Sequence, residues 1–439
     1  MLGLSTFFGL AFLLSIGTWF RPAVGFAAVL CLYGLKQWGQ DTSMFLVEHR
    51  TIANFVAAGL VAVGLVRQRM LASAGDRYGL SLPWVLCVVL YGYAFVTLAW
   101  TPDLKSALEQ WTLQGPYILM IALLAPLLLR HDEDLLQVSH WMLLVGGAIC
   151  VLALFFGHWG SRGLLFLGNV EDQEANPLAI ASLAGTVTVI AVLSFPSASW
   201  SKRVLCIALA PIGLVTILRS GSRGQLIATA IAIVIGSLLA APRKKLGPLL
   251  MLACILGGLV AVGSWAFSYM DVTGVDVDRW TGHRSEEDLQ GRLSSATDLL
   301  QIAISSPAAL LFGLGNSSAI HYVGYYPHVA PAEVLAEEGL LGMAVYLGII
   351  GTAALGIYRL KGQLEHNPDP RAHYACGLLA ALLIFELVLT AKEGSLLSST
   401  YVMAYAAAIG RLVRWDRTSA QSEAAREAVP ALPFPNVVR

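Results

Sequence analysis

Long apolar stretches, separated by short segments with charges, proline or glycine, recur along most of this chain. They stand at about 3–20, 22–38, 52–66, 82–100, 113–129, 138–157, 177–195, 203–218, 225–241, 246–268, 335–358, 375–391 and 395–410. A helix that crosses a bilayer needs about 20 apolar residues, because the hydrocarbon core is about 30 Å thick. The pattern therefore predicts an all-α polytopic membrane protein.

Composition and charge support this class and exclude others. Of the 439 residues, 56% are hydrophobic and 13% are charged, against roughly 25% charged in ordinary soluble domains. The 28 Lys and Arg balance 28 Asp and Glu, so no net charge attracts nucleic acid. We expect membrane lipids, and no nucleic acid, around the chain. The six cysteines lie in or beside apolar stretches and predict neither disulfides nor a zinc site.

The basic residues between the stretches predict the direction of the helices. The strongest basic cluster, Arg243–Lys245, indicates a cytoplasmic loop. Alternate loops counted from this cluster are also basic and contain Lys202 and Arg203, Arg130, Arg67, Arg69 and Arg77, then Arg359, Lys361 and Arg371, and finally Arg411, Arg414 and Arg417. The first two stretches fit this count if they form one broken or hairpin-like segment. We therefore expect about twelve transmembrane helices with both termini in the cytoplasm.

One polar segment, residues 269–332, lies on the side opposite Arg243–Lys245. Loops longer than about 15 residues are usually functional or disordered, and the helical run Leu289 to Ser305 favours an ordered, functional loop. We divide the chain into an N-terminal transmembrane bundle (1–268), this periplasmic loop (269–332), C-terminal transmembrane helices (333–411) and a cytoplasmic tail (412–439). From Thr418 the tail has no apolar period, and we expect it to be disordered.

Two arginines face outward where two predicted helices meet, in Arg219-Ser-Gly-Ser-Arg223-Gly224. The small residues allow close approach of the backbone, and two planar guanidinium groups suit a diphosphate. The alternative is that both arginines only extend from helix ends toward the membrane interface.

A third arginine, Arg292, follows Gly291 at the predicted start of the amphipathic run Leu293 to Ile304. A cation does not suit a helix N-terminus, whose dipole favours anions. This placement indicates that Arg292 and the helix end share an anion. The alternative is an exposed surface arginine.

His328 lies just before a predicted helix at the membrane surface, because Pro331 suits a first helical turn. A position at a helix N-terminus favours the neutral imidazole, which can act as a base. The alternative is a structural histidine that bridges loop carbonyls. Upstream, Phe312-Gly-Leu-Gly-Asn316 predicts a tight turn.

Two acidic features allow other interpretations. Asp276-Val-Asp278, with Glu286, Glu287 and Asp288 nearby, has a spacing that metal-dependent glycosyltransferases use, but such pairs are common by chance. We expect neither a metal nor a cofactor. Glu386 interrupts an apolar stretch and is either a functional group, such as a proton relay, or one partner of a buried structural pair.

The order and spacing of these motifs resemble those of a known family. His328-Val329, nine further residues and Gly339-Leu-Leu-Gly342 resemble the signature of bacterial O-antigen ligases, members of the O-antigen ligase and polymerase superfamily. Val329 departs from the Asn, Ser or Gln usual in that signature. Further similar landmarks, between Trp100 and Gly342, are Trp100-Thr-Pro102-Asp103, Ser222-Arg223-Gly224, Gly291-Arg292 and Gly313-Leu-Gly315.

The resemblance implies an integral glycosyltransferase of the bacterial inner membrane, with its active site facing the periplasm. It implies transfer of O-antigen from the donor, undecaprenyl diphosphate, to a sugar hydroxyl of the acceptor, lipid A–core. Carried over to this chain, Arg219, Arg223 and Arg292 hold the diphosphate, and Arg292 and His328 are catalytic, with His328 as the base. Fixed guanidinium groups can stabilise the leaving diphosphate in place of a metal. A single displacement then inverts the anomeric centre.

Two alternatives stay open beside the ligase. An O-antigen polymerase or a protein O-oligosaccharyltransferase of the same superfamily shares the donor and differs in the acceptor. A secondary transporter belongs to another class and is expected to show repeated halves with broken helices at the membrane midplane. In this chain the polar residues are concentrated in one outer loop instead.

Overall fold

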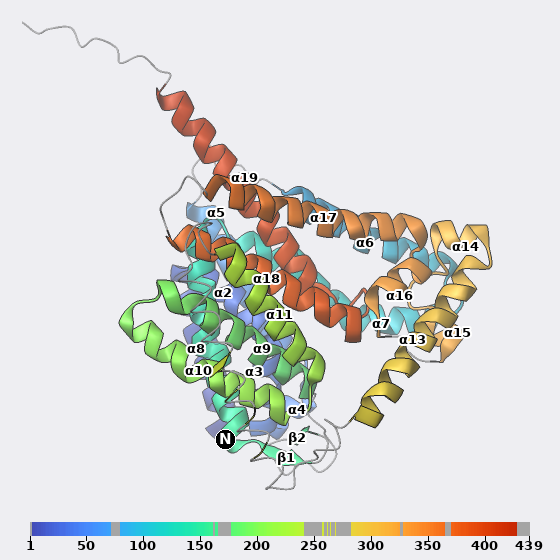
Figure 1. Cartoon of the computed structure of the whole chain (residues 1–439), viewed down its shortest axis with the longest axis horizontal. Coiled ribbons are helices and arrows are strands. Elements are labelled where there is room, and N and C mark those ends of the chain that lie inside the picture. Colours follow the sequence, from blue (N-terminus) through green and yellow to red (C-terminus); the bar gives the residue numbers. More distant parts are fainter. Residues whose placement is uncertain are drawn as a thin grey trace, which may run out of the picture.

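The computed structural model describes residues 2–71, 80–160, 163–165, 177–240, 282–324, 328–364 and 370–427, with 257, 258, 261, 264 and 268 (Figure 1). The first half of the described chain contains α1 (Leu2–Phe20), α2 (Pro22–Leu30), α3 (Leu32–Thr42), α4 (Met44–Glu48), α5 (Ile52–Leu71), α6 (Leu82–Val96), α7 (Leu104–Tyr117), α8 (Asp132–Phe156), α9 (Pro177–Ser194), α10 (Trp200–Arg219) and α11 (Arg223–Ala240). The second half contains α13 (Gly282–Ile304), α14 (Pro307–Phe312), α15 (Ala319–Val323), α16 (Ala330–Glu337), α17 (Gly339–Leu364), α18 (Pro370–Glu393) and α19 (Thr400–Glu427). A short antiparallel hairpin, β1 (His158–Gly160) and β2 (Gly163–Leu165), follows α8.

Nine helices in the described part of the chain are long and apolar enough to cross a membrane. They are Ile52–Leu71, Leu82–Trp100, Leu104–Leu128, Glu133–Phe156, Pro177–Ser197, Trp200–Arg219, Arg223–Ala240, Gly339–Leu364 and Arg371–Lys392. Helices satisfy their own backbone hydrogen bonds, which lipid cannot do for them. The prediction of a helical, polytopic membrane protein is therefore confirmed. The predicted stretch 246–268 lies almost entirely outside the described residues.

One of the crossings, Leu104–Leu128, departs both from a plain α-helix and from the predicted limits. The predicted stretch 113–129 begins earlier, at Leu104, and continues past Pro116 into a π-helical segment, Ile118–Leu124, and a 3-10 turn, Ala125–Leu128. Proline removes one backbone donor, and π-helical turns are a usual way to absorb such a defect. The apolar pattern alone does not reveal the polar first turns of this helix.

Basic residues meet at one end of the helix bundle. Arg130 donates to the Gln68 carbonyl at 2.6 Å, and Lys361 donates to the Leu239 carbonyl at 2.6 Å. The Arg411 guanidinium binds the carbonyl of the residue before Arg130. We call this end, where α5, the crossing Leu104–Leu128, α11, α17 and the apolar part of α19 have their C-terminal ends, the basic end. The structure thus brings together loops that the charge pattern predicts on one side.

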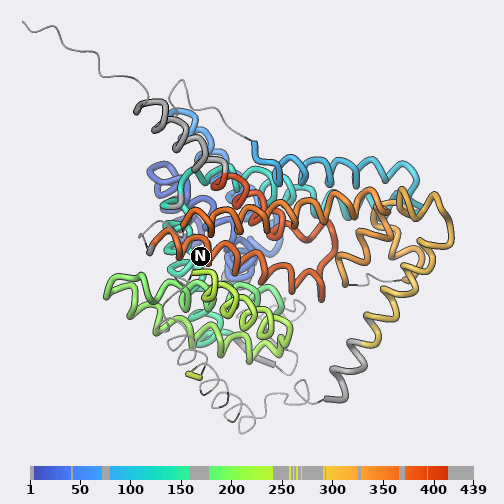
Figure 2. Tube along the Cα trace, turned by 45° about the horizontal axis from the view of Figure 1, so that its top comes forward, coloured from blue at the N-terminus to red at the C-terminus, as the bar shows by residue number. Residues whose placement is uncertain are grey.

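Other inter-helix connections meet at the opposite end, which we call the loop end. The Trp100 indole, at the end of a short 3-10 turn (Thr97–Trp100), donates to the Gly313 carbonyl at 3.1 Å. Lys392 of α18 lies against Gly224 of α11. The short helices α14, α15 and α16 gather here, at the ends of α6 and α17 (Figures 1 and 2). The loop end therefore carries every described residue of the predicted site.

The first helices are arranged differently from the prediction. Arg67 lies over the Trp19 ring at 5.4 Å, so α1 ends at the basic end. A side chain at Gly39 of α3 would meet Phe7, so α1 starts beside the end of α3. The predicted break is present, at Cys31 between α2 and α3. However, α1 pairs antiparallel with α2–α3 as a separate helix. Its start lies away from the C-terminal part of α19 (Figure 1), whereas both termini were expected on one side.

Two helices in the C-terminal part run across predicted limits. The division after residue 332 falls inside α16, and the change of direction occurs at Gly339, where φ is +67°. The helix α19 continues to Glu427, so residues 418–427 are helical where disorder was expected. This segment is poor in apolar residues but rich in Ala, Glu, Gln and Arg, which are strong helix formers. The remaining tail lies outside the described residues.

Candidate functional site

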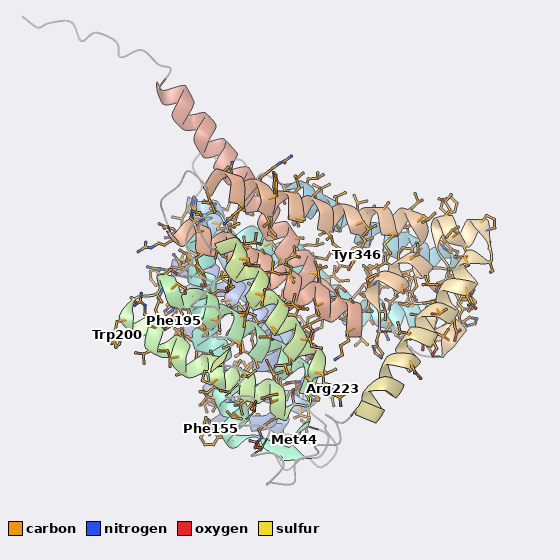
Figure 3. All side chains as sticks on the ribbon, viewed as in Figure 1. Met44, Phe155, Phe195, Trp200, Arg223 and Tyr346 are labelled. Carbon is orange, nitrogen blue, oxygen red and sulfur yellow. The ribbon has the colours of Figure 1, made fainter. Side chains whose placement is uncertain are left out.

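The turn between α10 and α11 places Arg219 at the end of one helix and Arg223 at the start of the next, as Figure 3 shows for Arg223. Gly221 allows the reversal because its φ is +68°. The Arg219 guanidinium donates to the Leu154 carbonyl of α8 at 3.2 Å, which fixes the arginine at the loop end. Ser222 is 2% exposed, and its buried hydroxyl has no hydrogen-bond partner within the described residues. An unused hydroxyl beside a helix N-terminus is suited to an anion.

Lys392 adds a third cation to this turn, and sequence reasoning missed it as a site residue. A Cβ placed on Gly224 would collide with the Lys392 side chain, with Nζ at 2.5 Å and Cε at 2.8 Å. The ammonium group therefore lies over the first turn of α11. A cation at the positive end of a helix dipole is unfavourable unless an anion is held between them. The sequence could not reveal this position of Lys392, because α18 and α11 meet only through tertiary packing.

Close backbone packing between α11 and α18 produces this contact. A Cβ on Gly377 of α18 would lie 2.6 Å from the Gly236 carbonyl of α11. Glycine at both positions lets the two helices approach, as small residues do in membrane bundles. The two helices are therefore held together below the site, and their ends at Gly224 and Lys392 stay adjacent.

His328 lies two residues before α16, on an exposed part of the chain. Its φ is +55°, one of two positive values among the described non-glycine residues; the other belongs to Ser317. Pro331 occupies the first turn of α16, so the predicted helix start is confirmed. A left-handed residue is tolerated at a cost of about 1–3 kcal/mol, and such residues concentrate at functional sites. The histidine is therefore displayed at the loop end by a constrained backbone.

Arg292 does not begin a helix, contrary to the prediction. The helix α13 starts at Gly282 and contains residue 292 in its middle. The residues before it, including Glu286, Glu287 and Gln290, favour helix and outweigh the single Gly291. The argument that Arg292 shares an anion with a helix N-terminus therefore fails. Its side chain lies outside the described part of the chain, and its role stays a prediction.

The glycine-rich motif 313–316 is more than a surface turn, because it docks on the end of α16. Leu314 N–H donates to the Ala336 carbonyl at 2.8 Å, and Gly315 N–H donates to the Glu337 carbonyl at 3.0 Å. These bonds satisfy carbonyls that a helix end leaves unpaired. Gly313 has φ +87° and lies against the Glu337 carbonyl, where no side chain fits. We call this contact region, residues 313–319 with 333–339, the junction.

The early motif ending α6 also joins the junction. Thr101 Oγ1 donates to the Asn316 carbonyl at 3.0 Å, and the Trp111 indole donates to Asn316 Oδ1 at 2.9 Å. Asp103 caps α7 by accepting the N–H of Ser106 at 3.1 Å. Hydrogen bonds from the Ser106 hydroxyl and N–H lower the pKa of Asp103. Three separate motifs of the sequence are thus assembled into one support for α16.

Three buried glutamates belong to the junction. Glu337 accepts N–H groups from Ser317 at 2.7 Å and Ala319 at 2.8 Å, one on each carboxyl oxygen. Glu338 Oε1 accepts the Asn316 amide at 2.7 Å, whereas its Oε2 has no partner in the described structure. Burial raises the pKa of Glu337 to about 7, and backbone N–H groups limit the rise. Burial, then the charge of Glu337, raises the pKa of Glu338 well above its ordinary value.

The third glutamate, Glu333, connects α16 to the turn after α18. Its Oε1 accepts the Leu396 N–H at 3.0 Å, and its Oε2 is buried without a partner in the described part of the chain. Burial, then Glu337, raises its pKa well above the ordinary value. Leu396 is four residues beyond Lys392. The helix that follows His328 is therefore tied to the helix end that carries Lys392.

The remaining predicted features fall outside this region. Asp276 and Asp278 lie outside the described residues, and the side chains of Glu286, Glu287 and Asp288 are not described. Within the described residues, no group of three His, Cys, Asp or Glu side chains is arranged to hold a metal ion. Glu386 is half-buried on α18 and lies near Tyr401 and Tyr405 of α19, and its role stays a prediction.

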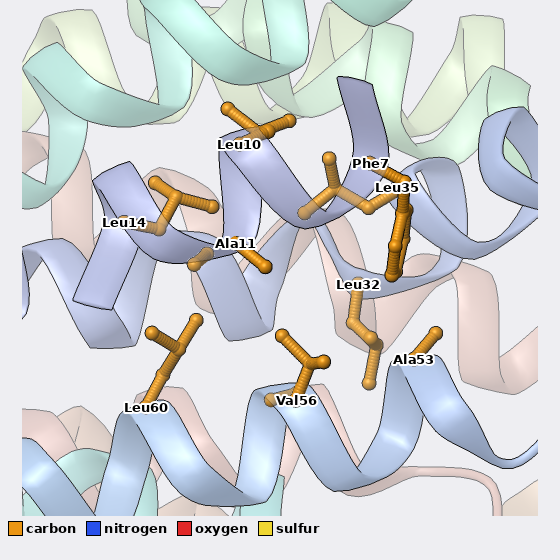
Figure 4. Close-up of a pocket in the computed structure, with 11 residues that line it drawn as sticks. Phe7, Leu10, Ala11, Leu14, Leu32, Leu35, Ala53, Val56 and Leu60 are labelled. Carbon is orange, nitrogen blue, oxygen red and sulfur yellow. The ribbon is translucent and has the colours of Figure 1, made fainter. Parts of the chain in front are cut away.

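An apolar pocket lies between α1, α2–α3 and α5 (Figure 4). Its lining includes Phe7, Leu14, Leu35 and Leu60, and none of the predicted site residues belongs to it. Because its lining is apolar, it lacks the donors that would bind a diphosphate. The polar features of the loop end therefore define the candidate site.

Comparison with known proteins does not identify the chain. No family model matches the sequence, and no curated protein matches it significantly. The candidate site thus rests on the geometry of the loop end and on the resemblance of its motifs.

Proposed function

We propose that this chain is a membrane glycosyltransferase of the O-antigen ligase type. It transfers a glycan from undecaprenyl diphosphate to a sugar hydroxyl of lipid A–core. The observation that carries the proposal is the set of cations at the start of α11. Arg223 and Lys392 flank a helix N-terminus with a buried, unused Ser222 hydroxyl, and Arg219 ends the preceding helix. This arrangement suits a diphosphate in the absence of a metal.

The transfer requires a base near the phosphate-binding group, and His328 is the candidate. It lies at the same end of the bundle and two residues before α16, the helix that Glu333 ties to the turn beyond Lys392. In the proposed reaction His328 removes the acceptor proton while the acceptor oxygen attacks the anomeric carbon. The bond to the diphosphate breaks, its electron pair remains on the diphosphate, and the anomeric centre inverts. Arg292 contributes a further positive charge from α13.

The proposed topology places the loop end, including residues 269–332, in the periplasm of a bacterial inner membrane. The basic end then faces the cytoplasm, in agreement with the positive-inside rule. Beyond the nine long helices, a further crossing is assigned to Thr400–Val413, and the apolar sequence at 246–268 predicts another. The antiparallel pair of α1 and α2–α3 completes the bundle. A lipid-linked donor and a lipid-linked acceptor both reach a site at this surface.

Deletion of the gene tests the proposal. Lipopolysaccharide from the deletion strain should lack full-length chains on a gel, while lipid-linked polymer accumulates. Accumulation of lipid-linked single units would instead indicate a polymerase. Unchanged lipopolysaccharide and unchanged lipid-linked glycans would reject both enzymes.

A further inference from the structure

Exposed apolar side chains surround α14, although this short helix belongs to the polar loop segment. Leu311 is 41% exposed and Phe312 is 47% exposed. They lie beside the ends of two membrane-crossing helices, which expose Phe95 and Trp100 of the α6 crossing and Leu340 of α17. A water-facing helix would be expected to carry polar residues on its exposed side. The sequence Pro307–Phe312 contains none.

The hydrogen bonds of α14 fix its depth relative to the α6 crossing. The Tyr93 hydroxyl donates to the Phe312 carbonyl at 2.9 Å. Tyr93 lies seven residues before Trp100, the end of that crossing, which is about 10 Å at 1.5 Å per residue. Side chains of a helix lean toward its N-terminus, which here is the interior of the membrane. The end of α14 therefore lies beside the last two turns of the α6 crossing.

A second contact places α14 beside the first residue of the α17 crossing. A Cβ on Gly339, the first residue of the α17 crossing, would lie 2.5 Å from the Leu311 carbonyl. Trp100 donates to the next carbonyl after α14, that of Gly313, and tryptophan is typical of the membrane interface. The exposed residues of α14 thus continue the apolar surface of the two membrane helices that flank it.

We propose that α14 is embedded in the bilayer leaflet at the loop end, with Leu311 and Phe312 in contact with lipid. The occupant of this exposed face is lipid because the face is continuous with the apolar surface of α6 and α17. The described helix α15 of the same segment does not share this property, since it carries the exposed polar residue His321. The inference is independent of the proposed transfer reaction.

Fluorescence quenching tests the proposal on the full-length protein in nanodiscs. Phe312→Cys is labelled with the dye NBD, and the bilayer contains phospholipid with a nitroxide on carbon 5 of one chain. The matched control is Tyr322→Cys on α15, because Tyr322 is also 41% exposed. We expect several-fold stronger nitroxide quenching at position 312 than at 322, and stronger quenching by aqueous iodide at 322. The unmodified protein, treated alike, gives the background from native cysteines.

Leu311→Cys provides a second labelled position if Phe312→Cys lowers the yield of folded protein. Strong nitroxide quenching at either position, with weak iodide quenching, supports a lipid-embedded α14. Iodide quenching at 311 and 312 equal to that at 322 would overturn the proposal. Protection from both quenchers would also overturn it, because the face would then be covered by protein.

Discussion

The side chain of Lys392, near the end of α18, lies against the backbone of Gly224 in the first turn of α11. This contact joins two residues 168 positions apart and places an ammonium group at the positive end of a helix. A helix N-terminus favours anions, so an anion bound between the two would be stabilised by both. It therefore leads to the first prediction.

Lys392→Ala is expected to weaken binding of the lipid-linked diphosphate donor by roughly 10–100-fold, the value of one charge-assisted contact. Gly224→Ala should weaken binding in the same direction, because the new methyl group displaces the lysine without removing its charge. Donor affinity of the purified protein, measured in detergent, checks both. Lys105→Ala, an exposed lysine at the start of α7, is the control and should bind normally. Normal binding by both site variants would remove Lys392 from the site.

His328→Ala should lower transfer by about 10²–10⁴-fold, the usual contribution of a general base, while donor binding is kept. His328→Asn separates chemistry from conformation, because asparagine tolerates a positive φ but is not a base. Rates of glycan transfer by purified variants check this. His321→Ala, another exposed histidine of the same segment, should stay active. If His328→Asn transferred at a normal rate, His328 would be a structural loop residue.

We expect glycan transfer to be independent of metal ions, because positively charged side chains of the protein neutralise the phosphate charge in the proposed site. Treatment of the purified enzyme with EDTA should leave transfer unchanged, and Asp276→Ala combined with Asp278→Ala should have a mild effect. Arg223→Lys should still be costly, because an ammonium group does not reproduce the planar fork of a guanidinium group. Loss of transfer in EDTA that Mg²⁺ or Mn²⁺ restores would contradict this prediction.

Membrane orientation is predicted from the two ends of the bundle. In spheroplasts, a cysteine at Asp298 on α13 should react with an impermeant thiol reagent, whereas one at Gly362 on α17 should react only after lysis. Both positions are exposed in the structure, so accessibility of the side chain does not bias the comparison. The reverse pattern of labelling would invert the topology and move the site to the cytoplasm.

The junction is expected to lose stability as the pH rises. Burial raises the pKa of Glu337 to about 7 in the folded protein, from the reference value of 4.5 for an unperturbed glutamate. The folded state then binds the proton more tightly, so the stability gained is complete below about 4.5 and is lost as pH rises through about 7. Thermal midpoints measured from pH 5 to 8 should fall. Glu337→Gln should flatten this dependence.

Substitution of each glutamate by glutamine distinguishes the roles of Glu337 and Glu338. Glu337 uses both oxygens as acceptors of backbone N–H groups, so Glu337→Gln turns an amide NH₂ toward a donor and should cost about 1–3 kcal/mol. Glu338→Gln keeps its acceptor for Asn316 and should cost less. Equal midpoints for the two variants would show that this difference in bonding has no energetic effect.

The sequence predicts the parts of this molecule that depend on local pattern. Apolar runs locate most of the crossings, the basic loops gather at one end, and Pro331 marks the start of α16. The sequence pattern gives the wrong helix limits where a tertiary contact or helix propensity determines the structure, as in the long α13 around Arg292. The position of Lys392 over Gly224 depends on how α18 packs against α11, and the residues near Lys392 in the sequence do not reveal this contact. The burial of Glu337 likewise depends on motifs that meet only in three dimensions.

Gly313 and Gly339 touch through their backbones, with 2.5 Å between the Gly313 nitrogen and a Cβ built on Gly339, and both have positive φ. A larger residue at one position is not accommodated by a smaller one at the other, because neither glycine has a side chain to remove. Among homologous sequences both sites should therefore stay glycine. Sequences that keep one glycine and lose the other should also lack the His328 motif, which makes the pair a marker for tracing this site through genomes.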